Sequence, residues 1–232
     1  SHPKDSLVEI HGNINYKRKI NAEQIDELEL ADWQSVREDN LKKDLFDLFG
    51  ITESGKINEK KSYRPHILLF DEYYTELYQY EKAITWILDA ETIIFMGASN
   101  SVGFTSGALL IGFSKNKKVI VVDPRRTDTA KEADLYLQIQ PGTDVALYHG
   151  MLHIMLWEKW IDETYIHSYT DGFESLKDLV RDFTPKAVSE ICGINEKDLI
   201  EAARLFATSD ATLSLDRKST RLNSSHTDIS RM

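Results

Sequence analysis

The clearest hydrophobic pattern in the chain lies in residues 117–126, which read KKVIVVDPRR. Val119 to Val122 are all branched and apolar, without polar alternation, and Asp123 and Pro124 follow them directly. An unbroken run of this kind is typical of a strand buried on both faces, as in parallel sheets covered by helices. Pro124 has no N–H to donate to a neighbouring strand, so the strand is predicted to end there.

Upstream of this segment, short apolar runs alternate with segments of helical spacing. The predicted strands are 7–14, the segment HILLF that follows Pro65, and 92–96, and the predicted helices are 73–88 and 104–113. Residues 17–61 are charged and weakly periodic, which predicts a helix with loops, broken at Gly50 and Gly55. Strand, helix, strand, helix and strand in succession predict a βαβαβ unit with parallel strands.

Downstream of the segment, helices dominate the pattern. A turn or short helix, a strand at 135–139 and a Pro-Gly turn precede a long amphipathic helix, from Thr143 or Asp144 to about Trp160. Further elements are helices at 162–169, 173–183, 185–191 and 196–207, and a strand at 212–215. The whole pattern predicts an α/β protein with a Rossmann-like parallel sheet flanked by helices and a helix-rich C-terminal half.

Composition narrows the classes of partner. The formal charge of -10 argues against nucleic acid, because binding to phosphates needs clustered Lys and Arg. No apolar run approaches the roughly 20 residues that span a bilayer, and no secretory segment is visible, so a cytoplasmic location without membrane binding is expected. Cys192 is the only cysteine, which excludes an internal disulfide and any zinc or iron–sulfur site built from this chain alone.

Two strand ends carry candidate nucleotide chemistry. Asp123 lies where open α/β sheets hold ribose hydroxyls or base edges, and a solvated aspartate beside a core strand is the alternative. The small residues Gly97, Ala98 and Ser99 follow the strand 92–96. They let a phosphate or ribose approach the backbone, although any tight strand-to-helix turn can use such residues.

Three histidines are the other candidates for chemistry. His11 stands where the first strand meets a loop, and a histidine hydrogen-bonded to backbone groups is the simpler interpretation. His149 and His153 have the i, i+4 spacing of a paired metal face, but no third ligand accompanies them. No metal site is therefore predicted.

Four segments in this order, VEIHG, RPHILLFDE, GASNSV and VIVVD, resemble the sirtuin family of NAD-dependent protein deacylases over residues 7–123. The resemblance implies that His11 is the catalytic base toward a ribose hydroxyl, which suits an imidazole that titrates near neutrality. It also implies that Gly97, Ala98 and Ser99 contact the adenosine half of NAD, with Ala98 in place of the usual Thr. The family's glycine-rich NAD loop, its Gln-Asn-x-Asp segment and its four zinc cysteines are missing, so only a partial NAD site is expected.

The segments VVDPRRTDTAKEADLYLQIQPGTDVALYHGMLH, GFESLKDLVRDFTPKAVSEICGI and AARLFA resemble the molybdopterin-dinucleotide oxidoreductases, nitrate reductases and formate dehydrogenases above all, over residues 117–215. In that family the Asp-Pro-Arg strand end and the Pro-Gly-Thr-Asp turn contact the guanosine part of molybdopterin guanine dinucleotide. The matching residues are Asp123, Arg125, Thr127, Gly142, Thr143 and Asp144. The iron–sulfur cysteines, the molybdenum-ligand segment and the C-terminal cap domain are missing, so this cofactor site too is expected to be partial.

The change of resemblance at residues 117–123 predicts a chimera, joined at a strand that both families place in a Rossmann-like sheet. The predicted divisions are a sirtuin-like fragment at 1–116, a molybdopterin-oxidoreductase fragment at 117–215, and a disordered tail at 216–232 that resembles a translated sequencing adapter.

Three hypotheses stay open for the function of the chain. They are a deacylase relic that retains His11, an oxidoreductase piece that retains Asp123 and Asp144, and a non-catalytic α/β module or assembly artefact without activity of its own. Both parent families are enzymes, but the chain lacks essential parts of each. The favoured hypothesis is therefore a chimera that carries two partial nucleotide-cofactor sites and catalyses nothing as an intact polypeptide.

Overall fold

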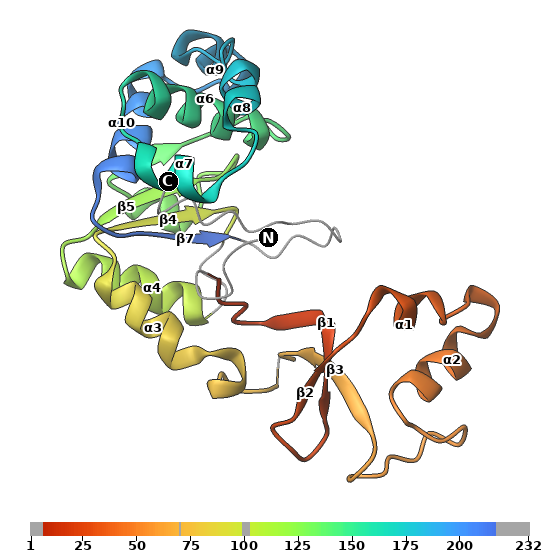
Figure 1. Cartoon of the computed structure of the whole chain (residues 1–232). Coiled ribbons are helices and arrows are strands. Elements are labelled where there is room, and N and C mark those ends of the chain that lie inside the picture. Colours follow the sequence, from red (N-terminus) through yellow and green to blue (C-terminus); the bar gives the residue numbers. More distant parts are fainter. Residues whose placement is uncertain (1–6, 70, 99–102, 217–232) are drawn as a thin grey trace. The chain divides into compact units, whose positions relative to one another are not determined.

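The computed structural model describes residues 7–69, 71–98 and 103–216, and the chain divides into two compact units. The smaller unit is Val8–Ala83, and the larger unit comprises Ile84–Met232 together with Ser1–Leu7. Each unit has a sheet of its own (Figure 1).

The larger unit is built on a four-stranded sheet whose strands all run parallel. Its strands, in the order β6-β5-β4-β7, are β6 (Leu135–Leu137), β5 (Lys118–Val122), β4 (Thr92–Met96) and β7 (Thr212–Asp216). The sheet confirms the predicted α/β fold with a parallel sheet between helices. The chain leaves β4 toward β5 on one side and returns as β7 on the other, so the strand order reverses at β4.

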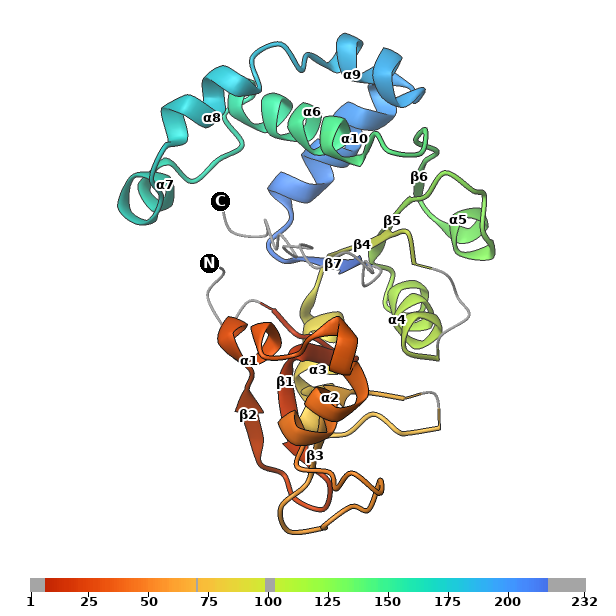
Figure 2. The same cartoon turned by 90° about the vertical axis from the view of Figure 1, so that its right-hand side faces the viewer.

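Two hydrophobic clusters cover the two faces of this sheet, and the residues of β4 and β5 alternate between them. Ile94 and Ile120 pack with α6 (Asp144–Trp157), α9 (Pro185–Cys192) and α10 (Glu196–Thr208). Ile93 and Val121 pack with α3 (Tyr80–Asp89), α4 (Gly103–Ser114) and α5 (Asp128–Glu132). Figures 1 and 2 show α4 on one side of the sheet and α6 and α10 on the other. Short helices α7 (Glu163–Tyr169) and α8 (Phe173–Leu179) connect α6 to α9.

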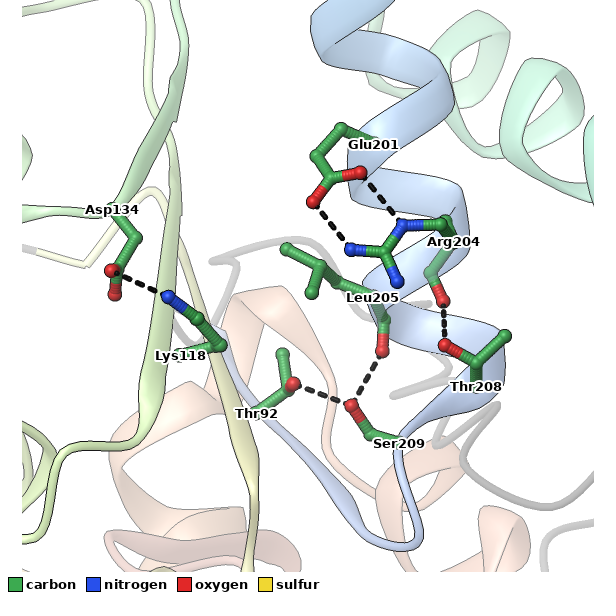
Figure 3. Close-up of polar contacts among 8 residues, drawn as sticks. All are labelled: Thr92, Lys118, Asp134, Glu201, Arg204, Leu205, Thr208 and Ser209. Carbon is green, nitrogen blue, oxygen red and sulfur yellow. Dashed lines mark hydrogen bonds and ion pairs between the residues drawn. The ribbon is translucent and has the colours of Figure 1, made fainter.

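Polar contacts hold the amino end of the sheet against α10 (Figure 3). Thr92, at the start of β4, shares a 2.6 Å hydrogen bond with the Ser209 hydroxyl, which itself donates to the Leu205 carbonyl at 2.6 Å. Lys118, at the start of β5, pairs with Asp134 before β6 at 3.2 Å. These contacts lie at the edge opposite to the strand ends where the candidate nucleotide residues were predicted.

The smaller unit contains a three-stranded antiparallel sheet in the order β2-β1-β3. The strands are β1 (Gly12–Lys19), β2 (Ile25–Glu27) and β3 (Tyr63–Ile67). Between β2 and β3 lie helix α1 (Leu30–Gln34), a 3-10 turn (Glu38–Asn40) and helix α2 (Leu41–Leu48), and a second 3-10 turn (Glu76–Tyr78) precedes α3.

Several predicted elements of the smaller unit are wrong. The strand expected from HILLF is β3, which begins at Tyr63 and pairs antiparallel with β1, so the parallel unit does not include it. Pro65 fits within β3 because β3 is an edge strand, where a missing N–H is tolerated, and because the β1–β3 register shifts between Asn13 and Lys17. The strand expected at 7–14 starts only at Gly12.

Among the helices predicted with defined bounds, three differ by more than one residue at one end, and of these the helix expected at 173–183 ends at Leu179. The helix expected at 73–88 begins at Tyr80, because a 3-10 turn and a left-handed Gln79 precede it. The helix expected to reach Trp160 ends at Trp157, since Lys159 adopts a positive φ of 60° that helical backbone cannot accommodate.

Along the chain, the boundary between the two compact units falls between Ala83 and Ile84. Residue 117 lies between α4 and β5, within the larger unit, because β5 pairs with β4 along its whole length. The predicted division at 116/117 concerns family likeness and stays a prediction. Residues 217–232 of the predicted tail lie outside the described residues.

Substitution of Gly150 by Ala should destabilise the larger unit. A Cβ at Gly150 of α6 would lie 2.8 Å from both γ-methyl groups of Val188 in α9, which is fully buried. Overpacking costs roughly 1–3 kcal/mol and the better helix propensity of Ala offsets about 1 kcal/mol of this cost. We expect Gly150→Ala to lower the free energy of unfolding by about 1 kcal/mol, measured by urea titration followed by tryptophan fluorescence.

Gly107→Ala is the matched control for this prediction. A Cβ at Gly107 of α4 meets no atom within 4 Å, so this variant should be neutral or slightly more stable. In a double-mutant cycle, Val188→Ala should cost less in the Gly150→Ala background than alone. Equal stability of Gly150→Ala and the unchanged chain would show that the two helices do not pack as described.

Glu72 stabilises the smaller unit in a way that depends on pH. Its carboxylate accepts hydrogen bonds from Arg18 at 3.1 Å, from Arg64, and from the Leu69 N–H at 2.9 Å. Burial by itself would raise the pKa of Glu72, but the hydrogen bonds and the two guanidinium charges outweigh it and lower the pKa. The cluster therefore stabilises the fold above the ordinary glutamate value of 4.5, and this contribution is lost as pH falls through the lower folded value.

Glu72→Gln should remove this part of the pH dependence and lower the free energy of unfolding at neutral pH by roughly 1–2 kcal/mol. Urea titrations at pH 7 and at about pH 3 measure both effects. Glu53→Gln is the control, because Glu53 is 81% exposed and pairs with Lys43 only at 3.8 Å. An unchanged difference between the two pH values in Glu72→Gln would contradict the role of this cluster.

Candidate functional site

The carboxyl ends of β4, β5 and β6 meet at one edge of the larger sheet. The Gly97 N–H, just after β4, donates to the Val122 carbonyl of β5 at 3.0 Å. The Asp123 N–H, just after β5, donates to the Leu137 carbonyl of β6 at 3.3 Å. The structure therefore brings Gly97 and Asp123, two residues predicted from separate segments, to the same edge. It is the edge at which open α/β sheets bind ligands, and β4 is the strand where the order reverses.

Asp123 is the most deeply placed polar group of this edge, with 3% of its surface exposed. Its Oδ1 accepts a hydrogen bond of 2.7 Å from the Arg125 N–H, which folds the chain into a tight turn immediately after the strand. The Arg125 side chain is 74% exposed and its Nε lies 3.9 Å from the same oxygen. The ion pair is thus weak, whereas the backbone hydrogen bond holds the carboxylate in a defined orientation.

Tyr136 supports Asp123, and the sequence interpretation missed it. Its hydroxyl donates to the Asp123 carbonyl at 3.0 Å, and Gln138 donates to the Pro124 carbonyl at 3.2 Å. Burial, and next the nearby charge of Asp123, raise the pKa of Tyr136, so the hydroxyl stays a donor throughout the neutral range. The alternation Leu135-Tyr136-Leu137 in the sequence indicates that the tyrosine side chain lies on the opposite face of the strand from the two leucines. Its hydrogen-bond partner could not be predicted, because that contact depends on β6 lying beside β5.

Capping of α5 explains the threonine at position 127. It is the N-cap of α5, and its hydroxyl oxygen accepts from the Ala130 N–H at 3.3 Å. The helix thus begins at Asp128, five residues after Asp123, and its cap fixes the turn that carries Arg125. A ligand contact by Thr127 stays a prediction.

The Pro-Gly-Thr-Asp turn follows β6 and leads into α6. Gly142 has φ of +84°, a conformation that favours glycine, and it is exposed together with Asp144. The Thr143 hydroxyl donates back to the Gln140 carbonyl at 2.7 Å and makes no cap hydrogen bond to α6. In α5, α7, α9 and α10, by contrast, a side chain accepts from the first turn. The first N–H groups of α6 therefore remain available to an outside acceptor.

The remaining residues predicted at this edge fall after β4. Gly97 has φ of +57°, which lets the chain turn directly after the strand, and Ala98 packs against the cluster beneath α4. Ser99 lies outside the described residues.

His11 belongs to the smaller unit, where it precedes β1. Its Nε2 lies 3.0 Å from the Tyr74 hydroxyl, within hydrogen-bond distance. The glycine after it is required, because a Cβ on Gly12, at φ of +74°, would lie 2.1 Å from the His66 carbonyl oxygen. The structure thus explains the His-Gly pair by the close approach of β1 and β3.

The pair His149 and His153 serves packing. The His153 Nδ1 bonds the Val180 carbonyl at 3.0 Å and its ring stacks on Trp157, while His149 packs edge-on against Phe183. Over residues 7–69, 71–98 and 103–216, no three His, Cys, Asp or Glu side chains converge as metal ligands, and no helix is both long and apolar enough to span a membrane.

The family-model match and the relatives found by sequence indicate the same family. The family model described as Molybdopterin oxidoreductase matches residues 5–195, and the chain belongs to this family. The F420-dependent formate dehydrogenase subunit alpha of Methanocaldococcus jannaschii is 45% identical over 96 residues, which are 41% of this chain and 14% of that protein. The nitrate reductase of Synechocystis is 41% identical over 100 residues, 42% of this chain and 14% of that protein.

A solved structure is also similar to this chain in sequence and fold. The acetylene hydratase of Pelobacter acetylenicus is 32% identical, with a TM-score of 0.52, over 55% of this chain and 18% of that one. The chain thus spans less than a fifth of the length of these three relatives.

Solved sirtuin structures align with the chain at a lower level. A Sir2 homologue in complex with ADP-ribose is 17% identical over 78% of this chain and 53% of that one, with a TM-score of 0.44. A likeness of this size carries no argument about function. The range matched by the family model, residues 5–195, includes residues 117–123. The predicted chimera and adapter-like tail stay predictions.

Proposed function

We propose that this chain forms part of the site for the guanosine end of molybdopterin guanine dinucleotide. Its family implies a molybdenum–pterin cofactor. The observation that carries the finer proposal is the buried, oriented carboxylate of Asp123 at the carboxyl edge of the sheet.

The chemistry of Asp123 fits a guanosine. A carboxylate accepts hydrogen bonds strongly, and guanine offers an N–H and an amino group on one edge while ribose offers hydroxyls. Since Oδ1 is engaged by the Arg125 N–H, Oδ2 is the oxygen left to meet the ligand. A carboxylate does not favour phosphate, so Asp123 would contact the base or the sugar.

The neighbouring groups fit the phosphates of a dinucleotide. The exposed guanidinium of Arg125 and the uncapped N–H groups at the start of α6 are both suited to anionic oxygens. Gly142 at the turn leaves space, because a Cβ built there meets no atom within 4 Å. When bound, the cofactor would supply the redox chemistry. The residues of this edge would hold and orient its nucleotide end.

Asp123→Asn tests the proposal, because the amide oxygen can still accept from the Arg125 N–H and keep the turn. We expect affinity for GDP, measured by calorimetry on the full chain, to fall roughly 10- to 100-fold, the effect of losing hydrogen bonds to a charged group. Asp128→Asn is the matched control, since the Asp128 side chain is 83% exposed and pairs with Lys131 in α5. Equal GDP binding by both variants, or no binding by the unchanged chain, would contradict the proposal.

The predicted sirtuin-like activity remains a second candidate, which rests on His11. The hydrogen bond between its Nε2 and the Tyr74 hydroxyl orients the ring, as a general base requires. If this candidate holds, the full chain should turn over an acyl-lysine peptide with NAD, and His11→Ala should abolish that turnover. His167→Ala, on the exposed face of α7, is the control. An unchanged chain without turnover and without heat on NAD titration would rule this candidate out.

A further inference from the structure

A narrow apolar cavity lies inside the larger unit, between the sheet and the helices α6 and α10. Side chains of β4, β5 and β6 line it on the side of the sheet. Residues that shape it include Met96, Tyr148, Met151, Met155, Ala202 and Phe206. It lies on the face of the sheet opposite to α4, within a single compact unit.

The lining of this cavity disfavours water. Apart from the Tyr148 hydroxyl, every side chain that lines it is aliphatic, phenyl or thioether. A buried water needs two to four polar partners, and a space walled by apolar groups stays dry or takes an apolar guest. Methionine side chains adapt to the shape of a guest, because they are unbranched and polarisable.

The mouth of the cavity lies at the carboxyl edge. Met96 and Tyr148 are partly exposed, whereas Met151, Met155 and Phe206 are buried. The Tyr148 hydroxyl donates to the Met96 sulfur across this opening. Because Met96 immediately precedes Gly97, a molecule entering here would pass beside the strand ends.

We propose that this cavity is a binding site for a small, uncharged, apolar molecule, entered between Met96 and Tyr148. The guest is held by dispersion contacts with the methionines and Phe206 and makes no required hydrogen bond. The cavity opens at the same edge as Asp123, but none of the residues of the proposed nucleotide site lines it, so the proposal does not rest on that site.

Xenon is the probe for this proposal. Full-length chain labelled with ¹³C at the methionine methyl groups is titrated with xenon gas and followed by methyl NMR. Signals are assigned by single substitutions of methionine by leucine. We expect saturable shifts of the Met96, Met151 and Met155 methyl signals. No saturable shift at these three methionines, or transfer of magnetisation from water to them, would overturn the proposal.

Substitutions at Ala202 distinguish xenon bound in the cavity from non-specific contact of xenon with the methionines. Ala202 lines the cavity and is almost fully buried. Ala202→Leu should therefore fill the space and abolish the saturable shifts. Ala202→Val is the milder variant, in case the larger side chain prevents folding. Ala31→Leu, at an exposed position of α1, should leave xenon binding unchanged. Saturable binding that persists in a folded Ala202 variant would place the xenon elsewhere.

Discussion

The parallel pairing of β4 with β5 sets the geometry of the larger unit, because both strands are buried on both faces. Ile93, Ile94, Val119 and Ile120 are each at most 1% exposed. Side chains of this kind contribute roughly 1.5–3 kcal/mol each when fully buried. That contribution requires helices on both sides of the sheet. The α3–α4 layer and the α6–α9–α10 layer are therefore consequences of these two strands.

The same constraint creates the candidate site. Since β4, β5 and β6 run in one direction, their carboxyl ends lie at one edge, and the residues that follow them must turn away from the sheet. A polar group at such an edge can be buried only if its oxygen or nitrogen is satisfied locally. Asp123 meets this condition through the Arg125 N–H, and Tyr136 fixes its backbone. The edge thus combines a rigid carboxylate with the uncapped start of α6.

The sequence was sufficient to predict a strand or helix where its apolar pattern fits only that kind of element. The strands at 92–96 and 119–122 and the helices of the C-terminal half were predicted because their patterns reflect burial against layers close in the chain. HILLF was misplaced for a physical reason: an apolar run does not reveal whether its partner is parallel or antiparallel, and β3 pairs with β1 some 50 residues earlier. Asp123 was predicted from its position after a strand. Tyr136 was not, because its contact exists only once β6 lies beside β5.

The strand β5, which was predicted as a junction between two families, is joined by hydrogen bonds to elements both before and after it in the chain. Lys117 donates to the Leu88 carbonyl at 2.7 Å and so fastens β5 to the end of α3 upstream, while Asp123 is held by Tyr136 downstream. A polypeptide joined at this strand would have to satisfy both sets of contacts to fold. The carboxyl edge of a parallel sheet is where open α/β folds bind ligands, and a buried carboxylate there is suited to the hydroxyl or N–H groups of a nucleotide. The position of Asp123 therefore supports nucleotide binding in general, whereas the choice of guanosine rests on the family and on the turns after β5 and β6.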